Sequence, residues 1–441
     1  MKACSQCQRL FPLEARFCPI DGTGLRPSAD VPIDGDPEDL RVGAHMCGDR
    51  YEIRRKVADG GMGRVYQALD RHEQRSVAIK VLHPEVAMDD IALERFKREF
   101  ELSARLPHDH IVEVLAFEET EDESFAMVME YLEGEELRSL MQREKLVRPE
   151  RVIRILSQLA IGLREPHALK VVHRDIKPDN IFLCGTEDGP LVKLLDFGSV
   201  RDNSLGAKKL TVIGTTIGSP FYMSPEQAQG LEDLDHRADV WSIAAIAYEA
   251  LTGKVPFYGV TGPQILLAIL GKEPVPPSVV TNAEGFAGVK VPEAVDDVIA
   301  DALSKNPAIR VGSVAELADR LGHAYGLVGD HSTWAAISET AVGNAVTAAA
   351  PKVAAAAHSS RSLGTAAARG DAFAGASSSR TLPSTRGGDA PFSGRGSSRD
   401  PFADDDYVMG LPDRGSSMTK YVVLGGVALL VLAGVAVMVF R

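Results

Sequence analysis

The chain has 441 residues, a length that allows about two or three domains. It is 45% hydrophobic and 25% charged, ordinary values for a folded protein that can build a sizeable core. The formal net charge of −13 argues against attraction of the whole protein to nucleic acid, so no nucleic-acid partner is expected.

The first 25 residues contain three of the five cysteines. Cys4 and Cys7 form a Cys-x-x-Cys pair, Cys18 follows, and Asp21 occupies the fourth place of a ligand set. Structural zinc is held tetrahedrally, mostly by thiolates, and a carboxylate oxygen can serve as one ligand. Because residues 1–25 have too little core to fold unaided, we predict a zinc site there. The segment resembles short zinc ribbons at the N-termini of bacterial signalling proteins. A tail with redox-active thiols, or a ribbon without metal, is the alternative.

The other two cysteines, Cys47 and Cys184, are isolated. The chain therefore has no disulfide framework, which fits a reducing compartment. Residues 26–47 are rich in Asp and Pro and are predicted to form a solvated linker. From residue 48 to residue 326, strand-like and helical patterns alternate with few low-complexity breaks, which indicates one large folded region.

A glycine-rich stretch at residues 57–63 joins two strand-like segments, residues 51–53 and 64–68. Glycines let the backbone fold closely over phosphates and present N–H groups to them. By itself this is a weak signal, since an ordinary hairpin turn explains it equally well.

Lys80 ends an alternating strand-like run that begins at Val77. A lone lysine on a strand is usually solvated, so a functional role requires a carboxylate partner. The helical segment at residues 93–106 places Glu99 on one face with Leu102 and Leu106.

Two short loops carry the most informative residues of the chain. Residues 173–180 read His-Arg-Asp-Ile-Lys-Pro-Asp-Asn, and Asp196-Phe197-Gly198 follows a strand-like run at residues 191–195. Phosphoryl transfer from ATP needs one carboxylate to orient the attacking hydroxyl, a second to hold Mg²⁺, and an amide to complete the metal shell.

The joint order and spacing of these motifs resembles the bacterial eukaryotic-like (Hanks-type) serine/threonine protein kinases. The resemblance covers about 280 residues and implies an α+β, two-lobed fold that uses ATP and Mg²⁺. A small, mainly antiparallel β lobe would carry Lys80 and its partner Glu99, which falls in the sequence pattern of the family's helix C. A larger helical lobe would carry Asp175.

The resemblance also implies the roles of individual residues. The catalytic residues would be Asp175, Lys177, Lys80 and Glu99. Nucleotide would bind at Val57, Ala58, Gly60, Gly61, Gly63, Val65, Ala78, Lys80, Glu130 and Leu132, and Mg²⁺ at Asn180 and Asp196. Ala58 replaces the first glycine of the family's phosphate loop, a departure expected to alter nucleotide affinity without abolishing binding.

The loop after Asp196 is expected to be a regulated, substrate-facing segment that ends in Ser-Pro-Glu at Glu226. Arg174 beside Asp175 is typical of relatives in which a phosphate orders this loop. We therefore expect autophosphorylation at one of three threonines, Thr211, Thr215 or Thr216. Structural roles are implied for Asp239, which would brace the catalytic loop, and for Arg310, which would pair with Glu226.

Residues 327–419 turn to Ala, Gly, Ser and Arg and are predicted to be a disordered linker. Residues 421–440 contain no charge and are bounded by Lys420 and Arg441. Twenty residues of helix cover about 30 Å, the thickness of the hydrocarbon core. We predict a single-pass transmembrane anchor at residues 420–441, in the inner membrane with the kinase region in the cytoplasm; a buried core helix is the alternative.

The sequence thus predicts a membrane-tethered serine/threonine protein kinase of bacterial signal transduction, with proteins as substrates. A pseudokinase scaffold that binds partners without transfer is the main alternative. A kinase of small molecules is a further one, against which the Gly218–Glu226 segment argues. Nothing in the sequence indicates an oligomeric state.

Overall fold

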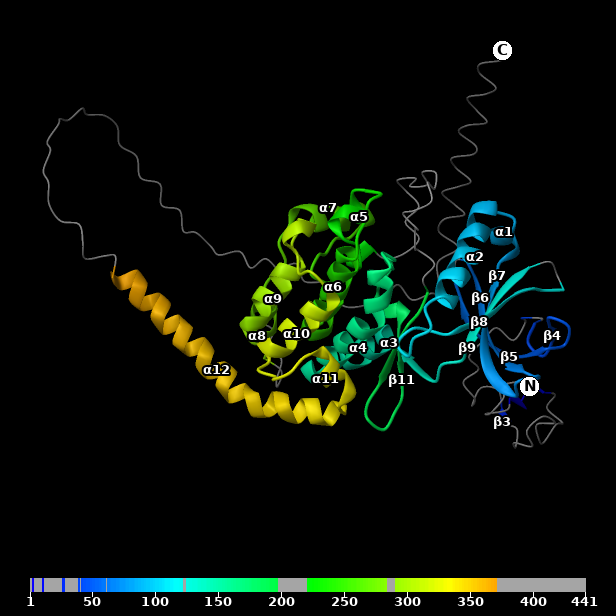
Figure 1. Cartoon of the computed structure of the whole chain (residues 1–441), viewed down its shortest axis with the longest axis horizontal. Coiled ribbons are helices and arrows are strands. Elements are labelled where there is room, and N and C mark those ends of the chain that lie inside the picture. Colours follow the sequence, from blue (N-terminus) through cyan, green and yellow to red (C-terminus); the bar gives the residue numbers. More distant parts are fainter. Residues whose placement is uncertain are drawn as a thin grey trace, which may run out of the picture. The chain divides into compact units, whose positions relative to one another are not determined.

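The computed structural model describes residues 41–60, 62–121, 124–196, 220–283 and 290–370, together with Asp39 and three short N-terminal strands (Figure 1). These strands, β1 (Lys2–Ala3), β2 (Leu10–Phe11) and β3 (Arg26–Pro27), pair antiparallel in the order β2-β1-β3. The four predicted zinc ligands, Cys4, Cys7, Cys18 and Asp21, lie outside the described residues.

The smaller lobe is a six-stranded antiparallel sheet in the order β4-β5-β6-β7-β9-β8. Its strands are β4 (His45–Met46), β5 (Tyr51–Asp59), β6 (Gly63–Asp70), β7 (Arg75–Leu82), β8 (Val114–Glu119) and β9 (Phe125–Glu130). Two helices, α1 (Pro84–Ala87) and α2 (Asp90–Ala104), follow β7. The period of two in β7 divides its side chains between two clusters: Val77, Ile79 and Val81 pack in one, and Leu82 in the other.

The second of these clusters sets the position of α2. Leu82, Phe96 and Met127 are buried together, and Phe96 shares a helix face with Glu99. The same strand face that carries Leu82 also carries Lys80, two residues earlier. Packing of Phe96 therefore turns Glu99 toward Lys80.

The larger lobe is mostly helical. It contains α3 (Leu137–Glu144), α4 (Pro149–Ala168), α5 (Pro225–Ala228), α6 (Arg237–Thr252), α7 (Gly262–Gly271), α8 (Pro277–Ala283), α9 (Ala294–Ala302) and α10 (Val314–Ala324). A small antiparallel sheet, β10 (Gly134–Glu136), β11 (Ile181–Cys184) and β12 (Leu191–Leu194), lies beside them. Short 3-10 turns are η2 (Pro178–Asn180), η3 (Pro220–Tyr222) and η4 (Pro307–Ile309).

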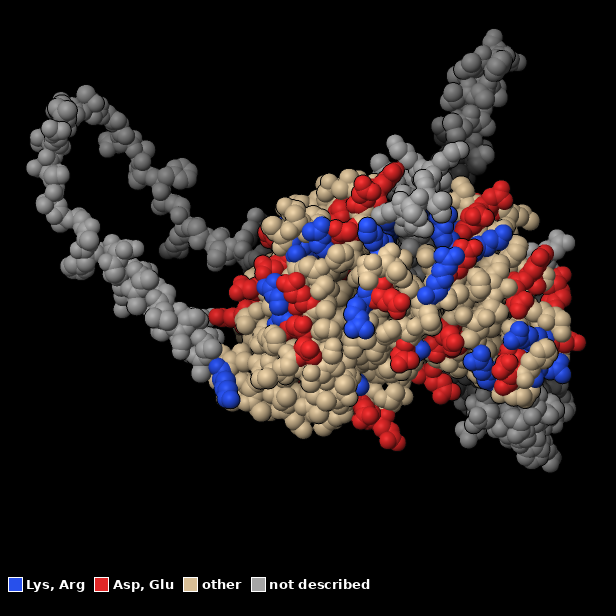
Figure 2. Space-filling model, viewed as in Figure 1, with Lys and Arg blue, Asp and Glu red and all other residues tan. Residues whose placement is uncertain are grey.

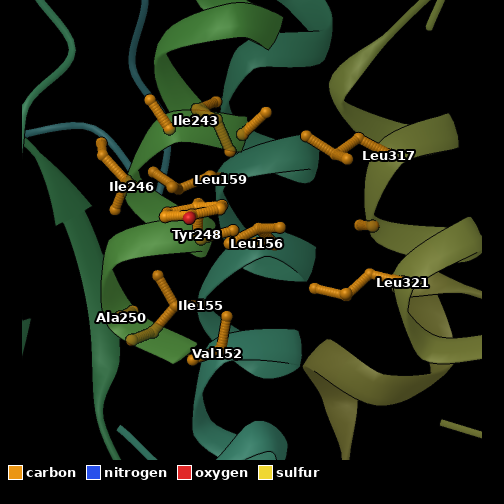
Figure 3. Close-up of a cluster of buried hydrophobic side chains, with 14 of the residues drawn as sticks. Val152, Ile155, Leu156, Leu159, Ile243, Ile246, Tyr248, Ala250, Leu317 and Leu321 are labelled. Atoms are coloured by element: carbon orange, nitrogen blue, oxygen red, sulfur yellow. The ribbon is translucent and has the colours of Figure 1, made fainter. Parts of the chain in front are cut away.

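Helix α6 is the centre of this lobe, since every residue from Ala238 to Thr252 is buried. Figure 3 shows its Ile243 and Ile246 among leucines of α4 and α10, including Leu156 and Leu317. A helix that is apolar on all sides has to be covered on all sides. The site elements that contact α6 consequently rest on a fixed support.

Residues 327–370 differ from the predicted disordered linker. They form α11 (His331–Ala336) and α12 (Glu339–Gly370), with Pro351 inside the second helix. Trp334 and Val342 are 2% and 0% exposed in the core of the large lobe. The Glu339 carboxylate accepts hydrogen bonds from Arg151 of α4 and from Arg148, the residue just before α4. The prediction of disorder was wrong here because average composition hides two well-placed apolar side chains and one acid that meets two arginines.

The predicted solvated linker also ends earlier than expected. Strand β4 adds an edge to the sheet through β5, and the Tyr66 hydroxyl donates to Asp39 over 2.8 Å. Within the described ranges, no helix is both long and apolar enough to cross a membrane. The predicted span at residues 421–440 lies outside those ranges.

Candidate active site

The β5–β6 hairpin forms the predicted phosphate loop. Ala58 lies in extended β5 opposite Val65, a conformation open to any residue, so the missing family glycine is not needed for the hairpin. Gly63 is needed, because a Cβ there would lie 2.2 Å from the Val81 carbonyl oxygen. The His83 ring nitrogen Nε2 lies 2.9 Å from the Gly60 carbonyl oxygen and ties the loop to the end of β7. Gly61 lies outside the described residues.

The other predicted nucleotide-binding residues are on neighbouring strands. Val57 is 44% exposed near the end of β5, and Ala78 is almost fully buried in β7. Glu130 ends β9, and its carboxylate accepts from Lys193 Nζ over 2.6 Å and from the Glu113 amide over 2.8 Å. Leu132 lies two residues beyond β9, in the connection between the lobes.

Lys80 connects the two lobes. Its Nζ donates to Glu99 Oε1 over 2.9 Å and to Asp196 Oδ1 over 3.1 Å. Glu99 is 3% exposed at its side chain, whereas Asp196 is 45% exposed. The structure therefore brings together three predicted site residues, of which Lys80 and Asp196 are 116 positions apart in the sequence.

Burial and charge act in opposite directions on this triad. Burial raises the pKa of Glu99, against the effect of Lys80. Burial alone would lower the pKa of Lys80, but the two carboxylates raise it above its usual range. For Asp196, burial opposes ionisation, yet the Lys80 ammonium holds the pKa of this carboxyl below its ordinary value. Lys80 is thus charged and Asp196 ionised at neutral pH.

The catalytic-loop residues form a second group. Lys177 Nζ donates to Asp175 Oδ2 over 2.8 Å, and Asn180 Nδ2 donates to the Asp175 carbonyl oxygen over 2.8 Å. The Leu195 amide donates to the Asn180 carbonyl over 2.9 Å, so Asp196 follows directly beside Asn180. Strands β11 and β12, paired from Ile181 with Leu194, hold these two positions together.

This arrangement fits a hard divalent cation. Because the Asn180 amide nitrogen is used by Asp175, its Oδ1 oxygen is turned away from that contact. Asp196 engages Lys80 through Oδ1 and retains a second carboxylate oxygen on a partly exposed side chain. Amide and carboxylate oxygens are ligands that Mg²⁺ accepts, together with phosphate oxygens.

Asp239 of α6 holds the backbone of the catalytic loop in place. This buried carboxylate accepts the His173 and Arg174 amides, each over 2.9 Å, and lies 2.9 Å from His167 Nε2. Burial opposes ionisation, but the His167 hydrogen bond and the amides hold the pKa of Asp239 below its usual range. Arg174 adopts φ of 68°, a left-handed conformation that these contacts stabilise. The contribution of His167 was missed, because a histidine near the end of a helix carries no local signal.

The segment after Asp196, residues 197–219, lies outside the described residues, as do Thr211, Thr215 and Thr216. The chain is described again from η3 onward. There, Glu226 of α5 pairs with Arg310 through two hydrogen bonds of 2.7 and 2.9 Å, and both residues are buried.

We expect Glu226→Gln to lower the free energy of unfolding by about 3 kcal/mol or more, because it leaves the Arg310 charge buried without its partner. Urea unfolding of the full chain measures this effect. Asp301→Asn is the matched control, since Asp301 pairs with Arg320 at the surface and should change stability by less than about 1 kcal/mol. Figure 2 shows that acidic and basic side chains lie near one another on this face of the molecule. Equal losses in the two variants would contradict a special role for the buried pair.

Comparison with known proteins was made against families, sequences and structures. Residues 51–324 match the model of the protein kinase domain. The chain is 36% identical over 267 residues to the serine/threonine-protein kinase pkn3 of Myxococcus xanthus, covering 60% of this chain and 48% of that protein. It is 35% identical over 272 residues to the serine/threonine-protein kinase PknB of Mycobacterium tuberculosis, covering 61% and 42%. The chain thus spans about half the length of the curated relatives it matches.

A crystal structure of the Mycobacterium tuberculosis PknI kinase domain superimposes with a TM-score of 0.50 at 29% identity, covering 65% of this chain and all of that one. The matched region contains the Lys80 triad, the catalytic loop and its α6 support. With well over half of its length matched by the family model, this chain belongs to the protein kinase domain family.

Proposed function

We propose that this chain transfers the γ-phosphoryl group of Mg²⁺-bound ATP to serine or threonine residues of other proteins, in bacterial signal transduction. The observation that supports this best is the Lys80 bridge to both Glu99 and Asp196. An active phosphotransferase needs this lysine charged, held and directed at the nucleotide phosphates, and needs the metal-binding carboxylate beside it.

In this proposal, each of the chain's own groups has a distinct role. Asp175 orients the acceptor hydroxyl and is placed to take its proton. Lys177, 2.8 Å from Asp175, adds positive charge where the transferred phosphoryl group would lie. When bound, Mg²⁺ would neutralise charge on the phosphates through Asn180 and Asp196. Lys177 is also the residue that favours serine and threonine acceptors over tyrosine.

A pseudokinase scaffold is less well supported. Such a protein would lack one of the groups that transfer requires. Here Lys80, Asp175, Asn180 and Asp196 are all present, with Lys80 bonded to Asp196 and Asn180 bonded to Asp175. A small-molecule kinase is also less well supported, because η3 and α5 form a braced segment beside the catalytic loop, where a protein acceptor would dock.

We expect Lys80→Met and Asp175→Asn each to reduce transfer of radiolabelled phosphate to protein by about 10²- to 10⁴-fold. The matched control is Lys272→Met, which changes an exposed lysine at the end of α7 and should retain full activity.

The same reactions, analysed by phosphopeptide mapping, should place autophosphorylation on Thr211, Thr215 or Thr216. Wild-type protein that binds ATP but transfers no more phosphate than Asp175→Asn would favour the scaffold.

We further propose that residues 1–25 bind one zinc ion through Cys4, Cys7, Cys18 and Asp21. The support is the spacing of the ligands and the small size of the segment. Metal analysis of the purified full chain should give about one zinc per chain, lost in the Cys4→Ser/Cys7→Ser double variant. The Cys47→Ser/Cys184→Ser variant should retain it. Full zinc content in the first variant would rule out this site.

We also propose that residues 420–441 anchor the protein in the inner membrane, with the kinase domain in the cytoplasm. The support is an uncharged run long enough to span the bilayer. The full chain should stay in the membrane fraction after alkaline carbonate washing, and a chain that ends at residue 419 should be released. Release of both, or retention of both, would count against the anchor.

A further inference from the structure

Arg138, in the first turn of α3, joins four separate elements. Its Nη1 donates to Glu249 Oε1 of α6 over 3.1 Å, and its Nη2 donates to the Tyr222 hydroxyl of η3 over 2.5 Å. Nη2 also lies 3.4 Å from Asp179 Oδ2 of η2, the residue before Asn180. One guanidinium therefore bonds to the catalytic-loop turn, to the segment that follows residues 197–219, and to the central helix.

Two of its partners, Tyr222 and Glu249, also bond to each other, so the three side chains form a buried triangle of hydrogen bonds. Tyr222 is 4% exposed and Glu249 is 6% exposed, and the Tyr222 hydroxyl donates to Glu249 Oε2 over 2.5 Å. Burial alone would lower the pKa of Arg138, but Tyr222 and Glu249 raise it. A buried carboxylate needs a charged partner, and Arg138 is the cation that bonds to Glu249 among the ion pairs of the described residues. The triangle therefore depends on this one side chain.

Tyr222 also connects this triangle to the catalytic loop. A small pocket beside the catalytic loop is lined by Arg174, Asp175, Ile176, Lys177, Tyr222 and Met223. Tyr222 and Met223 thus form one wall of a pocket that Asp175 also lines. The Tyr222 carbonyl also accepts from Ser242 Oγ of α6 over 2.8 Å, so the wall is fixed at its backbone by one residue and at its side chain by Arg138.

We propose that Arg138 is a positioning residue, which holds the Tyr222 wall and the Asp179 turn on either side of the pocket where the acceptor residue of a substrate protein meets Asp175. This inference rests on the proposed kinase function. Within the described ranges, Arg138 bonds to none of the residues assigned to nucleotide or Mg²⁺, so its loss should weaken use of the protein acceptor while use of ATP is unchanged.

The test compares Arg138→Gln with Arg143→Gln in the full chain. Both arginines lie on α3, but Arg143 is exposed and pairs with Glu135 and Glu144 at the surface. With α-casein as the acceptor protein, Arg138→Gln should raise the acceptor KM by about tenfold, as loss of a buried charged hydrogen bond predicts. The KM for ATP should stay within about twofold of wild type, and Arg143→Gln should match wild type in both constants.

A second readout does not need catalysis. Amide hydrogen exchange in residues 220–229 should accelerate in Arg138→Gln, while exchange in α10 stays as in wild type. If Arg138→Gln alone is poorly folded because Glu249 is left charged, the Arg138→Gln/Glu249→Gln variant removes both charges and should show the same two effects.

The outcomes separate the two proposals. An unchanged casein KM in an active Arg138→Gln enzyme, or unchanged exchange in residues 220–229, would overturn the role of Arg138. A parallel rise in both KM values would also overturn it, because that result indicates general damage to the site. If wild-type protein transfers no phosphate, the kinase proposal fails, and the exchange measurement still decides whether Arg138 holds the wall.

Discussion

The arrangement of the whole site depends on the ammonium group of Lys80, which lies between two carboxylates from different lobes. Glu99 is buried and has Lys80 as its cationic partner, while Asp196 bonds to the same ammonium group and remains 45% exposed at its side chain. The position of α2, the conformation of the chain at Asp196 and the closeness of the two lobes are linked by this one side chain. Any motion of α2 that removes Glu99 would also release Lys80 from its position.

The large lobe supplies a different kind of constraint. Helix α6 is buried on all sides and therefore cannot move without disrupting the core. It carries Asp239, which fixes the catalytic-loop backbone, and Glu249, which accepts hydrogen bonds from both Tyr222 and Arg138. Both carboxylates are fully or nearly fully buried and take their partners from other elements. The reactive groups are thus held by polar contacts that the apolar core makes rigid.

The extension beyond the matched family region is part of the folded body. Glu339 bonds to two arginines in the first turn and at the N-cap of α4, and its amide donates to the Asp188 carbonyl in the turn between β11 and β12. Arg154 of α4 in turn donates to the carbonyls of Ile337 and Pro190. The same hairpin presents Asn180 and Asp196 at its other end. The segment that leads toward the C-terminus is therefore bonded to the hairpin whose other end carries Asn180 and Asp196, the proposed metal ligands.

The sequence alone indicated the family, the order of the motifs and the chemical types of the site residues, because phosphoryl transfer requires those groups in short, recognisable loops. It also indicated Glu99 as the partner of Lys80, and the structure brings the two together. Tertiary structure alone decided that residues 327–354 fold, that Ala58 fits its strand and that Arg138 joins four elements. The folding of residues 327–354 and the role of Arg138 depend on contacts between positions far apart in the chain, which leave no local pattern of spacing, period or composition. The conformation at Ala58 depends on its pairing with Val65 across the hairpin.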